Sequence, residues 1–135
     1  MLASSALHTG QIYTRDDLQK QFDITDMTIR TGIFVPRGYD SIWLFITEKK
    51  PNGMTDYRDY LDGNKLDWDG QTSGRKDRLI IEHERNGFEI LVFYRTNKLE
   101  YNETGHPYGF KLEGQFRYRS SIGSNPTHFV LDRVR

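Results

Sequence analysis

The stretch Ile42-Trp43-Leu44-Phe45-Ile46 is apolar at every position and has polar neighbours, Asp40-Ser41 before it and Thr47-Glu48 after it. Its length and bulky side chains are typical of a strand that is buried on both faces, and less so of a helix. Other short apolar runs separated by turn residues follow it along the chain. The stretch therefore predicts a core built mainly from β-strands.

Asn86-Gly87 carries the strongest turn signal in the chain. It separates the apolar runs Arg78–His83 and Phe88–Arg95, and Asn-Gly between two such runs is typical of a β-hairpin. Pro51-Asn52-Gly53 is also expected to form a turn. The sequence thus predicts antiparallel neighbours joined by short connections.

Residues nearer the C-terminus continue this pattern. Polar and aromatic residues alternate over Gln115–Ser120, which places Arg117 and Arg119 on the face opposite to Phe116 and Tyr118. After a turn at Gly123–Pro126, Thr127–Val134 is expected to form the last strand.

One helix is expected before the strands. Thr14 can cap its free amides, Asp16 and Asp17 suit the positive end of its dipole, and the helix should end near Asp23. Residues 1–12 are expected to form a flexible leader without a signal peptide, because they contain neither a basic segment nor an apolar one.

The expected fold class is therefore α+β and mainly β. We predict a single domain over residues 13–135, with one N-terminal helix and a curved antiparallel barrel of five to seven strands. Phe45, Val92 and Phe116 should be buried.

Composition excludes several classes of function. The 135 residues include 19 Lys or Arg and 19 Asp or Glu, which argues against a uniformly basic nucleic-acid or membrane binder. The chain has no cysteine, so it can form no disulfide, and we expect a cytoplasmic protein. Its four histidines lie in separate segments without metal-ligand spacing, and no nucleophile motif occurs. We expect no membrane segment, no metal, no cofactor and no catalytic residue.

Charge is unevenly distributed along the chain. Residues 1–70 hold 8 Lys or Arg and 11 Asp or Glu, whereas residues 71–135 hold 11 and 8. The loop Gly70–Lys76 begins the more basic half and could contact phosphates through its amides and cations. Its candidate contact residues are Gln71, Ser73, Arg75 and Lys76. The same loop is equally well explained as an ordinary surface loop.

The segment Asp56–Gln71 combines aromatic residues, carboxylates and a central glycine. Tyr57 and Trp68 could sandwich a planar base, while Asp59 could accept a hydrogen bond from the amino group of cytosine. The competing interpretation places both aromatic residues in the core and assigns the aspartates to turns.

Five stretches resemble, in order, parts of the SRA family, whose domains recognise modified cytosine in DNA by base flipping. They are Thr31–Phe34, Tyr57–Gly70, Glu89–Asn97, Tyr108–Tyr118 and Phe129–Arg133. The resemblance implies a PUA-like curved barrel. It also implies that Asp59 reads the cytosine and that Trp68 stacks on it, with Tyr57 adjacent to the other stacking position. The chain is also similar to a domain of unknown function attached to bacterial helicases and HNH nucleases.

The sequence thus leads us to expect a non-catalytic domain that binds modified double-stranded DNA. Arg75 or Lys76 would approach the gap left by the flipped base, Arg117 and Arg119 would hold the backbone, and a nuclease or helicase would act in cis or in trans. Two alternatives stay open: a protein- or peptide-binding β-module and a small-molecule sensor barrel. Whether the domain forms a homodimer is also open.

Overall fold

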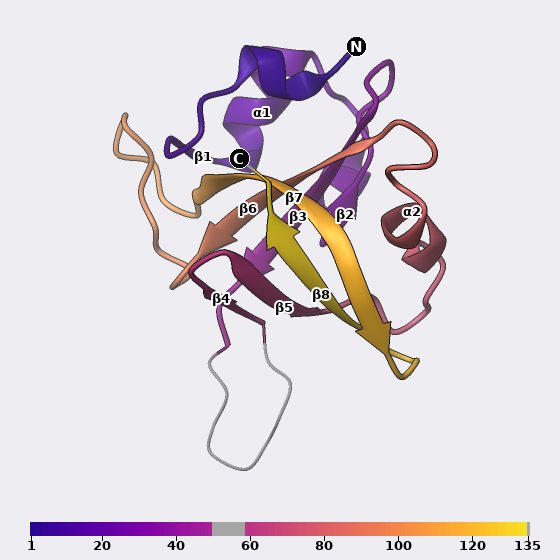
Figure 1. The fold of residues 1–135 in the computed structure, drawn as a ribbon. Helices are drawn as coiled ribbons and strands as arrows, with labels where there is room; N and C mark the ends of the chain where they lie inside the picture. The colour runs from indigo at the N-terminus through magenta and orange to yellow at the C-terminus, as the bar shows by residue number, and fades with distance from the viewer. Residues whose placement is uncertain (50–58, 135) are drawn as a thin grey trace.

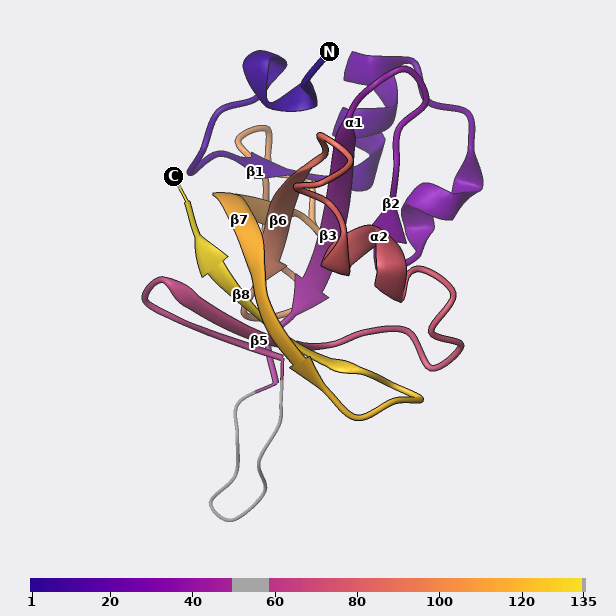
Figure 2. The ribbon, with the colours of Figure 1, turned by 45° about the vertical axis from the view of Figure 1, so that its right-hand side comes forward.

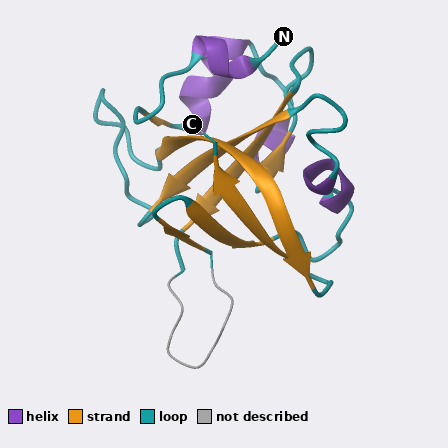
Figure 3. Cartoon of the chain, viewed as in Figure 1, coloured by secondary structure: helices purple, strands orange, loops and turns teal. Residues whose placement is uncertain are grey.

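The computed structural model describes residues 1–49 and 59–134, and its main feature is one curved sheet (Figures 1 and 3). The strands are β1 (Ile12–Tyr13), β2 (Ile33–Phe34), β3 (Ser41–Thr47), β4 (Tyr60–Asp62), β5 (Lys65–Asp69), β6 (Glu89–Arg95), β7 (Phe110–Ile122) and β8 (His128–Arg133). Their order is β2-β3-β6-β7-β8-β5-β4, and β1 pairs with β7 outside this path. Among the described residues the end strands β2 and β4 do not pair, so the expected closed barrel is not formed. The expected mainly β fold is confirmed.

The sheet is mixed and not purely antiparallel. β3 and β6 run parallel, with Ile42 opposite Ile90 and Phe45 opposite Phe93, whereas the other pairs are antiparallel. Parallel neighbours need a long crossover. Here the chain passes through β4, β5 and a short helix before it returns as β6. The predicted hairpin around Asn86-Gly87 is therefore wrong, although Gly87 does turn the chain at a φ of 75°.

The short helix α2 (Asp77–Ile81) lies where the sequence predicts a strand over Arg78–His83. Arg78 and Glu82 are four residues apart, and their side chains form an ion pair of 3.3 Å. Ile80 is buried, whereas Ile81 is exposed. Three adjacent apolar residues, Leu79-Ile80-Ile81, are compatible with the two-residue period of a strand and with the 3.6-residue period of a helix. The run is therefore too short to distinguish the two structures.

The N-terminal helix is confirmed as α1 (Arg15–Phe22). Thr14 Oγ1 accepts a hydrogen bond from the Asp17 amide at 3.0 Å, and Asp17 Oδ2 accepts one from the Thr14 amide at 2.9 Å. This reciprocal capping box satisfies two amides that no helix bond can reach. Leu18 is buried, and the Phe22 ring lies 5.2 Å from that of Trp43, so α1 packs against one face of the sheet.

Two hydrophobic clusters cover opposite faces of the sheet. Ile42, Leu44 and Ile46 belong to one cluster, and Trp43 and Phe45 belong to the other. β3 is therefore buried on both faces, as its continuous apolar stretch predicts. The expected burial of Phe45, Val92 and Phe116 is confirmed.

The segment before β1 also contacts the sheet. It contains a 3-10 helix, η1 (Ala3–Ala6), whose Ala3 is buried. The Ala3 amide donates to Ser41 Oγ at 3.1 Å, and the Ser4 amide donates to Glu89 Oε2 at 3.0 Å. These bonds hold the expected leader against the starts of β3 and β6.

Candidate nucleic-acid interface

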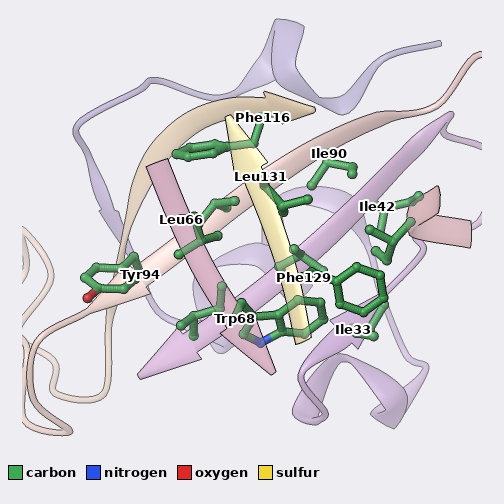
Figure 4. Packing of buried hydrophobic residues seen from close by; sticks show 13 residues of the cluster. Ile33, Ile42, Leu66, Trp68, Ile90, Tyr94, Phe116, Phe129 and Leu131 are labelled. Atoms are coloured by element: carbon green, nitrogen blue, oxygen red, sulfur yellow. The ribbon is translucent and has the colours of Figure 1, made fainter. Parts of the chain in front are cut away.

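Trp68 lies on β5, on the side of the strand that faces the core. The burial of β5 alternates, with Leu66 and Trp68 buried between less buried neighbours. The indole is only 4% exposed and stacks on the Phe129 ring, with centroids 5.5 Å apart (Figure 4). In this arrangement the indole ring is not open to a base, and Trp68 is a core residue and not the expected stacking residue.

Asp59 precedes β4 and is partly buried. Its Oδ1 accepts a hydrogen bond from the Asp69 amide at 2.9 Å, which joins it to β5. Burial raises the pKa of the Asp59 carboxyl, and the nearby charge of Asp69 adds to this rise. Tyr57 and the Pro51-Asn52-Gly53 turn lie outside the described residues. Trp68, the described aromatic residue expected to stack beside Asp59, thus offers no open face.

The other carboxylates of β5 bind a buried histidine on β8. His128 Nδ1 lies 2.8 Å from Asp69 Oδ1, and His128 Nε2 lies 2.8 Å from Asp67 Oδ1. Each ring nitrogen of His128 therefore has a carboxylate oxygen of β5 within hydrogen-bond distance. Asp67 and Asp69 therefore link β5 to β8. This pairing could not be predicted from local patterns, because His128 lies 59 residues beyond Asp69.

The loop Gly70–Lys76 lies beside the turn between β7 and β8. The Gly70 amide donates to the Thr127 carbonyl at 2.8 Å. Arg75 and Ser73 are exposed, and Gln71 is partly buried. Lys76 differs from the expectation, because its ammonium donates to the Ile33 carbonyl on β2 at 3.1 Å. Lys76 is thus partly engaged by the fold, whereas Arg75 is available to a partner.

Arg117 and Arg119 point outward from β7, as the alternation predicts. Arg119 Nη1 lies 3.6 Å from Asp132 Oδ1 on β8. Arg117 is exposed, and no carboxylate of residues 1–49 or 59–134 lies within 4 Å of its guanidinium. Figures 1 and 2 show β7 bending along its length towards the turn that joins it to β8. The β7–β8 hairpin, which we define as residues 110–133, therefore carries cations on its outer side.

Two further exposed arginines lie close to this loop along the chain. Arg78 on α2 and Arg85 after it both contact Glu82, at 3.3 and 3.9 Å. Both are largely exposed. Their spacing of four and three residues from Glu82 would have indicated them, had the segment been assigned to a helix.

The structure also shows what the described residues lack. Over 1–49 and 59–134, no group of three or more His, Asp or Glu side chains is placed to hold a metal ion. Within the same ranges, no helix is long and apolar enough to cross a membrane. Several cavities surround α1.

No protein-family model and no curated protein matches this sequence.

Proposed function

We propose that this domain binds duplex DNA through the β7–β8 hairpin and the loop Gly70–Lys76. The observation that carries the proposal is the exposed Arg117, which forms no ion pair with a described carboxylate although Asp132 lies opposite it on β8. The exposed Arg119 lies on the same strand. Arg75 adds a third exposed cation, on the loop beside the same hairpin. Cations of this kind contact phosphates and contribute affinity for every sequence.

The hydrogen bonds of the loop support this assignment. Gly70 and Asp77 flank the loop, and both bond to Thr127 in the β7–β8 turn, at 2.8 and 2.5 Å. The loop and the hairpin are therefore positioned together before any partner binds. A pre-positioned surface loses less conformational freedom on binding than a mobile one.

The specificity that we propose is for a modified cytosine, which rests on the resemblance to SRA domains. Asp59 is the residue that would read the base edge, since its second oxygen accepts no hydrogen bond from the described residues. Trp68 takes no part in the contact because it is buried. A nuclease or helicase in another segment or chain would act on the DNA.

Fluorescence anisotropy with one duplex sequence, containing cytosine, 5-methylcytosine or 5-hydroxymethylcytosine, tests the proposal. Arg117→Ala should weaken binding to all three duplexes equally and lower the slope of log K against log salt by about one unit. Arg37→Ala is the matched control, because it removes one exposed cation from the segment before β3. Equal effects of the two variants, or no binding by the native chain at low salt, would overturn the proposed interface.

Asp59→Ala separates base reading from phosphate contact. We expect it to narrow the affinity difference between modified and unmodified duplexes, with thermal melting as the check on folding. If it instead tightens binding to every duplex alike, Asp59 acts only as a repelling charge. If the native chain binds no duplex, the protein-binding and sensor alternatives gain support.

A further inference from the structure

A cavity of about 350 Å³ lies between the start of α1 and the loop 96–109. Arg15 and Lys20 of α1, Arg30, and His106 and Tyr108 of the loop contribute to its lining. Its volume falls in the range of small-molecule sites. The loop lies on the left of Figure 1, away from the β7–β8 turn at the lower right.

Arg15 is held rigidly in this cavity. Its Nε donates to the Ile29 carbonyl at 2.8 Å, and its Nη2 donates to the Thr31 carbonyl at 3.2 Å. Its guanidinium also lies 4.6 Å from the centroid of the Phe45 ring. These contacts leave Nη1 without a hydrogen-bond partner among the described residues. The side chain is therefore a positioned donor.

A second arginine lies near Arg15. Both Arg15 and Arg95 contact the Phe110 ring, with guanidinium carbons 5.0 and 4.1 Å from its centroid. No carboxylate in the described part of the chain lies within 4 Å of either guanidinium. Burial, with the nearby charges of Arg95 and Arg30, lowers the pKa of Arg15 to about 10, and burial also lowers that of Arg95. A partly buried guanidinium without an ion pair favours a bound anion, and of these two arginines Arg15 is the one that lines the cavity.

The two carboxylates that line the cavity are already engaged. Asp16 pairs with Arg30 at 2.5 Å. Asp17 accepts hydrogen bonds from the Thr14 amide and from Asn102 Nδ2, at 2.9 and 2.8 Å. Lys20, in contrast, is exposed and pairs with no described carboxylate. The Asp17 partners are neutral, so its charge remains, and three cations, Arg15, Lys20 and Arg30, face two carboxylates, which leaves the lining with an excess of one positive charge.

Tyr108 supplies an aromatic surface at the same cavity. Its side chain is 59% exposed, and its φ of 70° is rare for a bulky L-residue. The next residue, Gly109, donates its amide to the Glu100 carbonyl at 2.7 Å, and a Cβ there would lie 2.5 Å from Ile12. The loop is thus closely packed against β1 while the Tyr108 ring stays open to solvent. Strained, exposed residues of this kind often mark ligand sites.

We propose that this cavity binds a nucleoside monophosphate, with its phosphate at Arg15 and Lys20 and its base on the Tyr108 ring. The Nη1 of Arg15 can donate to a phosphate oxygen, and bases of every kind stack on aromatic side chains. The bounded volume suits one nucleotide better than a polymer. The site goes beyond duplex binding and uses a different part of the molecule.

Isothermal titration with adenosine 5′-monophosphate, adenosine and inorganic phosphate tests the site on the full chain. We expect the monophosphate to bind at least about tenfold more tightly than either fragment, because only it engages both the arginine and the tyrosine. Equal affinity for adenosine would overturn the phosphate contact, and equal affinity for phosphate would overturn the stack. No binding of the monophosphate at millimolar concentration would overturn the site.

Tyr108→Asn is the sharpest variant, because Asn tolerates a positive φ and the fold should persist. It should weaken monophosphate binding roughly five- to hundredfold, the range for one lost stack. Tyr101→Asn is the matched control, since Tyr101 is 55% exposed on the same loop and does not line the cavity. Lys20→Ala should weaken the monophosphate and leave adenosine unchanged. Equal losses of monophosphate affinity in Tyr101→Asn and Tyr108→Asn would overturn the assignment. Unchanged monophosphate affinity in both Tyr108→Asn and Lys20→Ala would overturn it as well.

Discussion

Trp68 on β5 and Tyr108 on the loop 96–109 are both aromatic residues close to carboxylates, yet they lie in opposite environments. Trp68 is 4% exposed and stacks on Phe129 in the core, whereas Tyr108 is 59% exposed beside a cavity. The carboxylates near Trp68 bind His128 or a strand amide, and those near Tyr108 form a helix cap and an ion pair.

Backbone conformation explains the difference. Trp68 lies in a strand whose alternate residues point inward, so the same regular geometry that pairs β5 with β8 also buries the indole. Tyr108 lies in a left-handed conformation in a loop, where no alternation directs the side chain inward. An aromatic residue near acidic residues is therefore a candidate for base stacking only when its backbone leaves the ring open.

Replacement of Trp68 should give the largest effect and is the most direct way to break this comparison. Trp68→Ala should lower the free energy of unfolding by about 3–5 kcal/mol, because it leaves a cavity beside Phe129. Denaturant unfolding measures this loss, and Trp68→Phe should cost less. A well-folded Trp68→Ala variant with native stability would show that the indole is not a core residue and would restore its expected stacking role.

The elements that the sequence predicts correctly are those determined by local patterns. Ile42–Ile46 and the Thr14 cap each depend on a few adjacent residues, and both predictions are confirmed as β3 and the start of α1. The hairpin at Asn86-Gly87 fails because the partner of β6 is decided by a crossover from β3. Gly87 provides the turn, but only tertiary packing selects the strand that lies next to it.

The candidate site was harder to predict than the fold. Outward-facing Arg117 and Arg119 follow from alternation within one strand. The burial of Trp68, in contrast, depends on Phe129, which is 61 positions later in the chain and on another strand. The cavity at Arg15 needs three separate segments, and the sequence shows the charges of its lining residues but not that these segments meet.

Replacement of Tyr94 tests how strongly β4 is held against β6. Its hydroxyl donates to Glu48 Oε1 at 2.7 Å and accepts from the Leu61 amide at 3.2 Å, which links β6 to β4. Burial, with the hydrogen bond to Glu48, raises the pKa of Tyr94, so the hydroxyl stays protonated. Tyr94→Phe should cost about 1–3 kcal/mol in thermal or denaturant unfolding, because two partly buried polar groups lose their partner. A cost near zero would mean that β4 is held without this bond.

Replacement of Thr14 tests how much the helix cap stabilises α1 and leaves the Tyr108 ring unchanged. Thr14→Ala should cost about 1 kcal/mol, because the Asp17 amide loses its acceptor. Thr14→Ser keeps the hydroxyl and should retain most of the stability, as monitored by thermal unfolding. If both variants are equally destabilised, the loss comes from packing of the threonine methyl group and not from the cap.

Replacement of Asp59 should change the free energy of unfolding least among these variants, and it should raise it. Burial raises the pKa of Asp59 above its ordinary value of 3.8, so the folded state binds more protons than the unfolded state between these two pKa values. Stability contributed by protonated Asp59 is therefore complete below pH 3.8 and is lost as the pH rises through the folded-state pKa. Asp59→Asn removes the charge while its amide oxygen can still accept from the Asp69 amide. The variant should be more stable than the native chain at pH 7, by less than about 1 kcal/mol, and this gain should disappear towards pH 3. Unfolding curves at several pH values measure the difference. A gain that persists at pH 3 would show that the ionised carboxylate is not its source, and Asp59 would then resemble Tyr108 in being open to solvent.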